Sequence, residues 1–154
     1  MIAAIALGSN LGDREGNLRE AVRRMGALGR VAAVSGFYDT EPVGYLDQPR
    51  FLNAAVLLET ELLPVELLRR LLGIEQEMGR DRANSPPKGP RVIDLDLLLY
   101  GELVMQSAEL TVPHPAMHER AFVLAPLAEI AVGMLHPVLH RSIGELLALL
   151  SANQ

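Results

Sequence analysis

The order of strand-like and helix-like segments is the feature that most limits the folds open to this chain. Runs of strand-forming residues alternate with segments whose apolar residues recur at helical spacing. The order is strand, helix, strand, strand, helix, strand, at residues 2–7, 18–28, 31–38, 51–60, 64–78 and 92–100. This order predicts an α+β fold with a ferredoxin-like βαββαβ core, in which helices cover one face of an antiparallel sheet. We also expect a short hairpin at residues 103–112 and C-terminal helices at 116–131 and 143–150.

Two polar segments interrupt this pattern. Residues 39–50 and 79–90 are rich in proline, glycine and charged side chains, and they contain little that a core would bury. Loops of this length are often functional. We expect residues 79–88 to be mobile without nucleotide and to become ordered when ligands bind.

The composition limits the class of protein. The 154 residues, 49% of them hydrophobic, are enough for one domain, which we place at residues 1–154. No run reaches the roughly 18 consecutive apolar residues of a membrane-spanning helix, and the apolar start lacks the basic flank of a signal peptide. The lack of cysteine excludes disulfides, so the cytoplasm is the expected location. A net charge of −5 argues against a general nucleic-acid or membrane binder. We expect its partners to be small molecules, and we expect a monomer.

Two aspartates on one predicted strand give the clearest chemical signal. Side chains at positions i and i+2 of a strand share a face, so Asp94 and Asp96 should point together while Ile93, Leu95 and Leu97 point into the core. Two adjacent carboxylates repel each other unless a cation lies between them. Mg²⁺ suits this pair, because it binds one or two carboxylates and completes its shell with water and phosphate oxygens. The alternative is a solvated strand face that carries two aspartates.

Arginines surround this strand in the sequence. Arg80, Arg82 and Arg91 flank the second polar segment and lead into the carboxylate strand, which favours binding of phosphate groups over simple solubility. Glu75 is expected either to accept a hydrogen bond from a nucleotide or, more simply, to pair with a neighbouring arginine. His114 lies between two prolines, which suits a residue that positions a phosphate, although a lone histidine is more often structural.

Five short motifs together resemble one family, the 6-hydroxymethyl-7,8-dihydropterin pyrophosphokinases of folate biosynthesis. They occur in the family's order between about residues 7 and 126. The motifs are ALGSNLGD at 6–13, FYDTEP at 37–42, DQPRFLNA at 47–54, GPRVIDLD at 89–96 and VPH at 112–114. The resemblance implies a βαββαβ core and a reaction in which the pterin hydroxymethyl oxygen attacks the β-phosphorus of ATP and releases AMP. It also implies two Mg²⁺ ions as cofactors.

The resemblance further implies a set of site residues. The matching metal ligands are Asp94 and Asp96, and Arg80 and Arg91 join them as catalytic residues. The matching contacts to ATP and its phosphates are Glu75, Arg80, Arg82, Arg91, Leu97, Thr111, His114 and Arg120. The matching pterin pocket is Thr40, Val43, Phe51, Asn53 and Phe122. A flat heteroaromatic ring needs aromatic faces and an amide at its edge. Without the resemblance, Phe51 and Phe122 would be ordinary core residues and Asn53 a polar residue at the start of a strand.

The sequence departs from the family pattern at two positions. Lys88 stands where the family often has tryptophan, and Pro115 stands where it often has tyrosine. Two other functions would use parts of the same pattern. A magnesium-dependent nucleotide hydrolase would use the aspartates with water as acceptor, and it would not need a stacking pocket. A ferredoxin-like ligand-sensing module would bind an effector without chemistry, and it would not need arginines beside two carboxylates.

Overall fold

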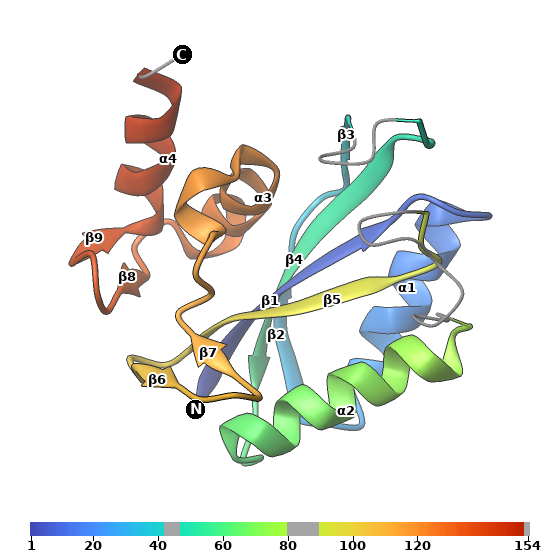
Figure 1. Cartoon of the computed structure of the whole chain (residues 1–154), viewed down its shortest axis with the longest axis horizontal. Coiled ribbons are helices and arrows are strands. Elements are labelled where there is room, and N and C mark those ends of the chain that lie inside the picture. The colour runs from blue at the N-terminus through green and yellow to red at the C-terminus, as the bar shows by residue number, and fades with distance from the viewer. Residues whose placement is uncertain (42–46, 80–89, 153–154) are drawn as a thin grey trace.

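The sheet of the computed structural model has the strand order of a ferredoxin-like fold (Figure 1). The structure describes residues 1–41, 47–79 and 90–152. The elements of the core are β1 (Ile2–Ser9), α1 (Arg14–Met25), β2 (Arg30–Val34), β3 (Tyr38–Thr40), β4 (Phe51–Glu59), α2 (Pro64–Glu77) and β5 (Asp94–Tyr100). The order across the sheet is β2-β4-β1-β5, β3 pairs with β4, and all pairs are antiparallel. The predicted α+β fold is confirmed.

Helices cover both faces of this sheet. Helices α1 and α2 pack on one face of the sheet. The fully buried residues there are Leu18 and Met25 of α1, Leu67 and Leu71 of α2, and Ile5 of β1. The other face packs against α3 (Ala121–Ala131), and α4 (Ile143–Ala152) packs against α3; Ala4 and Leu99 of the sheet belong to one buried cluster with Leu124, Leu127 and Ile143. The alternation of side chains along β1 therefore separates two apolar cores. Helix α3 thus covers the sheet face that the two core helices leave open, and α4 lies beyond it (Figure 1).

Local sequence explains where the two core helices begin. The Asp13 carboxylate caps α1 by accepting the Gly16 N–H at 3.0 Å. Helix α2 starts with Pro64, whose fixed φ suits the first helical position, and the Glu66 carboxylate accepts the Leu63 N–H at 3.2 Å. None of the described helices is long and apolar enough to span a membrane.

The strand predicted at residues 31–38 is wrong as one continuous element. It divides into β2 and β3, because the Ser35 hydroxyl accepts the Ala55 N–H of β4 at 2.8 Å and interrupts the backbone ladder. The first strand is also longer than predicted and ends at Ser9.

The C-terminal part differs from the prediction at one point that matters for the site. The hairpin of β6 (Met105–Gln106) and β7 (Thr111–Val112) is confirmed, and a second hairpin is formed by β8 (Leu135–His136) and β9 (Arg141–Ser142). The helix predicted at residues 116–131 is broken into a 3₁₀ turn, η1 (Met117–Glu119), and α3. Arg120 between them has an extended backbone, with φ −122° and ψ 103°. This break directs a new helix, and the residues at its start, toward the sheet.

Candidate active site

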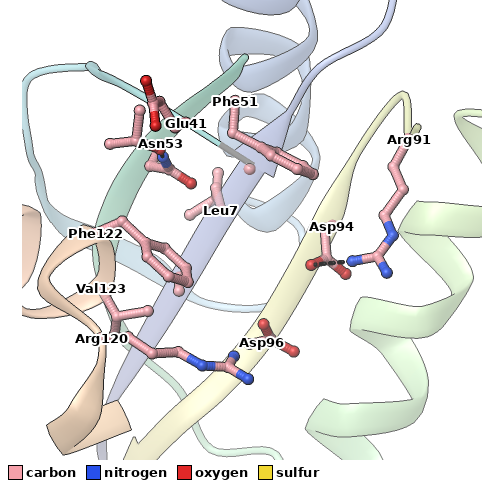
Figure 2. A pocket seen from close by; sticks show the side chains of 13 residues that line it. Leu7, Glu41, Phe51, Asn53, Arg91, Asp94, Asp96, Arg120, Phe122 and Val123 are labelled. Atoms are coloured by element: carbon pink, nitrogen blue, oxygen red, sulfur yellow. Dashed lines mark hydrogen bonds and ion pairs between the residues drawn. The ribbon is translucent and has the colours of Figure 1, made fainter. Parts of the chain in front are cut away.

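A pocket lies on the sheet face that α3 covers, beyond the N-terminal end of that helix (Figure 2). Strands β1, β3, β4 and β5, the segment before β5, Arg120 and the first turn of α3 contribute to it. The thirteen residues that line it are Ala6, Leu7, Gly8, Thr40, Glu41, Phe51, Asn53, Arg91, Asp94, Asp96, Arg120, Phe122 and Val123. Asp94, Asp96, Arg91 and the end of the Arg120 side chain gather at the β5 side of this pocket, whereas the aromatic and amide side chains come from β4 and α3, with Glu41 beside Asn53 (Figure 2).

The two aspartates of β5 face the pocket together, as predicted. Asp94 pairs with Gly8 and Asp96 with Ala6 on the neighbouring strand, so no bulky cross-strand side chain covers the carboxylates. The intervening Leu95 is 3% exposed and packs in the core on the opposite face. The register between β1 and β5 shifts between Ala4 and Ile5, where β5 contains one extra residue. This residue follows both aspartates in the sequence, so the alternation of Asp94 and Asp96 with their neighbours is not disturbed.

This donor set fits Mg²⁺. Two carboxylates on one pocket wall supply the hard oxygen ligands that the ion prefers, and the rest of its shell can come from water and phosphate oxygens. Among residues 1–41, 47–79 and 90–152, no group of three or more acidic or histidine side chains is placed to hold a metal alone.

Arg91 supports the charged side of the pocket. Its Nη1 lies 3.0 Å from Oδ2 of Asp94, and its side chain is only 17% exposed. Arg120 reaches the pocket from the extended residue before α3, and its guanidinium carbon lies 5.8 Å from the ring centroid of Phe122. In Figure 2 the Arg120 side chain extends across the pocket wall in the direction of Asp96. Two guanidinium groups thus flank the carboxylate pair. The predicted Arg80 and Arg82 lie outside the described residues.

His114 is held as a neutral imidazole beside this site. Its Nδ1 accepts the Ala116 N–H at 3.1 Å, which leaves the ring hydrogen on Nε2. Burial lowers the pKa of His114, the charge of Arg120 lowers it further, and the charge of Asp94 opposes both. The backbone N–H of His114 donates to the Leu98 carbonyl oxygen at 2.8 Å, so His114 lies beside β5, although it is not among the residues that line the pocket. A neutral ring offers one N–H donor for an anionic ligand.

Three predicted nucleotide contacts have other positions. Glu75 is 2% exposed on α2, and its carboxylate accepts the Leu95 N–H at 2.7 Å on the outer edge of β5. The alternative pairing of Glu75 with an arginine stays a prediction. The Leu97 side chain is 3% exposed in the core, so only its main chain is available to a ligand. Thr111 belongs to the β6–β7 hairpin and does not line the pocket.

The aromatic side of the pocket gathers the predicted pterin residues. Phe51 and Phe122 are both half-buried in its wall, and Asn53 is 6% exposed. The Asn53 Nδ2 donates to Thr40 Oγ1 at 2.5 Å, which directs the amide oxygen toward Gly8. Two ring faces and one oriented amide are the groups that recognise a flat polar heterocycle. Val43 lies outside the described residues.

Gly8 was missed as a site residue, and its lack of a side chain shapes the pocket. A Cβ at this position would lie 3.2 Å from Asn53 Oδ1 and 3.5 Å from Cδ1 of Phe51. The sequence carried a signal for this feature. Ala6 and Gly8 are small residues at positions i and i+2 of a strand, which indicates a close approach of backbone or ligand on that face. Glu41, Leu7 and Val123 also line the pocket, and no pattern in the sequence distinguished them.

Comparison with known proteins gives a consistent family match. The model of the family described as 7,8-dihydro-6-hydroxymethylpterin-pyrophosphokinase (HPPK) matches residues 4–132. The 2-amino-4-hydroxy-6-hydroxymethyldihydropteridine pyrophosphokinase of Bacillus subtilis is 53% identical over 131 residues, which cover 84% of this chain and 77% of the relative. Its namesake from Haemophilus influenzae is 44% identical over 137 residues, covering 88% of this chain and 84% of the relative. The folic acid synthesis protein fol1 of Schizosaccharomyces pombe is 43% identical, and the match covers 95% of this chain but only 20% of that longer protein.

Solved structures share the fold at low sequence identity. A crystal structure of HPPK-DHPS in complex with substrates has a TM-score of 0.77 at 14% identity, over 99% of this chain and 44% of that chain. A triple mutant of Plasmodium falciparum HPPK-DHPS has a TM-score of 0.80 at 17% identity, with the same coverage. At these identities the likeness shows the fold alone.

Proposed function

Because the chain belongs to the 7,8-dihydro-6-hydroxymethylpterin-pyrophosphokinase family, we propose that it transfers a pyrophosphoryl group from ATP to 6-hydroxymethyl-7,8-dihydropterin. In this reaction the hydroxymethyl oxygen forms a bond to the β-phosphorus of ATP. The bond from that phosphorus to the oxygen bridging the α- and β-phosphates breaks, and AMP leaves with this oxygen. The hydroxyl group loses its proton. The product is the pterin diphosphate, an intermediate of folate biosynthesis.

The observation that carries the proposal is the division of one pocket into two chemically different sides. Phe51, Phe122 and Asn53 suit a flat ring with polar edges, whereas Asp94 and Asp96 suit a metal-bound phosphate chain. A hydrolase that used water as acceptor would need only the charged side. An acceptor that carries a ring next to its reactive hydroxyl uses both sides. Holding both reactants in one pocket provides the alignment on which group transfer depends.

Each protein group has a role that follows from its chemistry. Asn53 orients the ring edge through its amide, which Thr40 holds in place. Arg91 and Arg120 bind phosphate oxygens, and His114 donates its Nε2–H to the same chain of phosphates. We include Arg80, Arg82, Glu75, Leu97, Thr111 and Val43 in the proposed site on the family motif alone.

Mg²⁺ is part of the proposal. Asp94 and Asp96 would hold it, and two ions are expected. When bound, Mg²⁺ neutralises phosphate charge and aligns the reacting oxygens. The carboxylates themselves repel polyphosphate unless a cation intervenes, so they also make ATP binding depend on the metal. A monomeric state and a cytoplasmic location stay predictions from the sequence.

The test is the formation of AMP from ATP in the presence of Mg²⁺, with and without 6-hydroxymethyl-7,8-dihydropterin. We expect AMP only when the pterin is present, together with a pterin product whose mass has increased by a diphosphate group. AMP or ADP formed without pterin would instead indicate a nucleotide hydrolase. Binding of the pterin without any nucleotide product would indicate a ligand-sensing module.

A further inference from the structure

Asn10 is a buried polar residue that the proposed chemistry does not use. It follows β1 directly, and it is only 1% exposed. A buried amide without hydrogen bonds destabilises the fold, so the partners of this amide show what the residue does. The partners of Asn10 belong to two segments that are far apart in the sequence.

Both the oxygen and the nitrogen of the Asn10 side-chain amide form hydrogen bonds. Its Oδ1 accepts the Arg91 N–H at 2.7 Å, and its backbone N–H donates to the Arg91 carbonyl at 3.0 Å. On the other end, Nδ2 donates to Oε1 of Gln48 at 2.8 Å and to the carbonyl oxygen of Pro49 at 3.1 Å. Backbone groups on the two sides fix which end of the amide carries the oxygen. The position requires one acceptor and two donated hydrogens, which an amide provides and a carboxylate does not.

These two segments lead to opposite sides of the pocket. Arg91 carries the guanidinium that pairs with Asp94, and β5 with both aspartates starts three residues later. Pro49 lies two residues before Phe51, where β4 begins with the aromatic wall and Asn53. The Asn10 amide therefore connects, by hydrogen bonds, the segment at Arg91 that leads to the phosphate side of the pocket and the segment at Pro49 that leads to the pterin side.

We propose that Asn10 is a positioning residue, which fixes the phosphate-binding segment at Arg91 relative to the pterin-binding segment before β4. This inference rests on the proposed function. Each side of the pocket keeps its own binding groups without Asn10, so each substrate alone still binds. What is lost is the alignment between the hydroxymethyl oxygen and the β-phosphorus. A misplacement of about 1 Å can reduce a rate by roughly 100-fold, so the effect should appear mainly in kcat.

Asn10→Ala tests the inference against a matched control, Asn17→Ala. Asn17 has the same side chain and steadies the same loop, because its Nδ2 donates to Ser9 Oγ at 3.1 Å and to the Leu11 carbonyl at 2.8 Å, but it does not line the pocket. We expect Asn10→Ala to reduce kcat by about 10- to 100-fold while the Kd values for a non-hydrolysable ATP analogue and for pterin change by less than about threefold. Asn17→Ala should keep kcat within about twofold of wild type. Similar kcat losses in both variants would overturn the inference.

Two further variants keep the test decisive if Asn10→Ala folds poorly. Gln48→Ala removes one partner of the amide and should reduce kcat less than Asn10→Ala, with no further loss when the two changes are combined. Asn10→Asp keeps the acceptor for the Arg91 N–H but has no hydrogen to donate until its new carboxyl group is protonated. Its kcat relative to wild type should therefore rise as the pH falls toward the pKa of that carboxyl group, while the ratio for Gln48→Ala stays flat.

The outcomes separate this inference from the proposed function. If the wild-type protein forms no AMP with pterin, the proposed function fails, whatever the variants do. If wild type is active and Asn10→Asp and Gln48→Ala both retain wild-type kcat at all pH values, only the positioning role fails. A loss of affinity for both substrates in parallel with kcat, or a reduced number of binding sites per molecule, would show a purely structural role and would also overturn it.

Discussion

Replacing Gly8 with alanine should weaken pterin binding without weakening the fold. Gly8 lies in β1, and its φ is not positive, so an alanine backbone fits there. The added methyl group would stand on the pocket face at 3.2 Å from Asn53 Oδ1 and 3.5 Å from Cδ1 of Phe51. The first distance is shorter than an ordinary van der Waals contact, so the Asn53 amide must move by a few tenths of an ångström. That amide is the oriented polar group at the proposed ring edge.

The expected loss of pterin affinity follows from the displacement of the Asn53 amide by the methyl group. Loss of one hydrogen bond from a buried amide costs about 1 to 3 kcal/mol, which corresponds to a rise of roughly 5- to 150-fold in Kd. The fold should be as stable as wild type or up to about 1 kcal/mol more stable, because alanine loses less backbone entropy than glycine on folding. Affinity for the ATP analogue should stay within about twofold, because the methyl group points at the aromatic side.

The assay is calorimetric titration of pterin into protein that carries a non-hydrolysable ATP analogue, together with thermal melts. Gly73→Ala is the matched control. It makes the same chemical change inside α2, where a Cβ meets no atom within 4 Å, so it should stabilise the protein by about 0.5 to 1 kcal/mol and leave both affinities unchanged. Wild-type pterin affinity in Gly8→Ala would refute the placement of the ring beside Gly8. Equal losses for both ligands would mean that the methyl group distorts the sheet.

Two other variants test the aromatic wall and the C-terminal hairpin. Phe122→Ala should weaken pterin binding by about 1 to 3 kcal/mol, and ATP binding much less, if its half-buried ring provides a stacking face. Calorimetric titration of both ligands checks this, and equal losses would mark Phe122 as a core residue only. Burial lowers the pKa of His136, and the charges of His118 and His140 lower it further. The folded state therefore binds a proton at His136 less readily than the unfolded chain, whose histidine pKa is about 6.5. Stability is therefore lost as the pH falls below about 6.5. His136→Asn keeps an acceptor for the Val138 and Leu139 N–H groups, so its melting temperature should fall less than that of wild type between about pH 7.5 and about pH 5.5; equal falls would contradict the assignment.

The carboxylate strand could be predicted from the sequence because it depends only on the period of two. Ile93, Leu95 and Leu97 alternate with Asp94 and Asp96. On a strand, such alternation places the three apolar side chains on one face and the two carboxylates on the other. The order of the core elements was predictable for a similar reason, because each segment carries its own period.

Other parts of the site depend on contacts that no local pattern encodes. A half-buried phenylalanine looks the same in a core and in a ligand pocket, so Phe51 and Phe122 were identified only through the family motif. Glu75 was unexpected as an edge partner for β5, because the spacing along α2 says nothing about which strand the helix covers. The break at Arg120 was also missed. Apolar residues continue at helical spacing on both sides of it, and the turn is set by packing of α3 against the sheet.

The same limit applies to Asn10. In the sequence it is one polar residue in a turn-rich motif, and its role follows only from the two distant segments that it joins. Long-range hydrogen bonds of a buried amide are a tertiary property, which periodicity does not reveal.

The most direct test of the central claim is AMP formation by Asp96→Ala across a magnesium titration, with thermal melts of wild type and variant in the absence of metal. Asp94→Ala and the isosteric Asp96→Asn complete the series. Removing one of two adjacent carboxylates relieves their repulsion, so we expect melting temperatures within about 3 °C of wild type. Loss of a metal ligand removes several kcal/mol of charge stabilisation, so we expect pterin-dependent AMP formation to fall by at least about 100-fold and to respond less to magnesium. Near-normal AMP formation at low magnesium, in an Asp96→Ala protein that melts normally, would contradict the assignment of these aspartates to the metal and the phosphate chain.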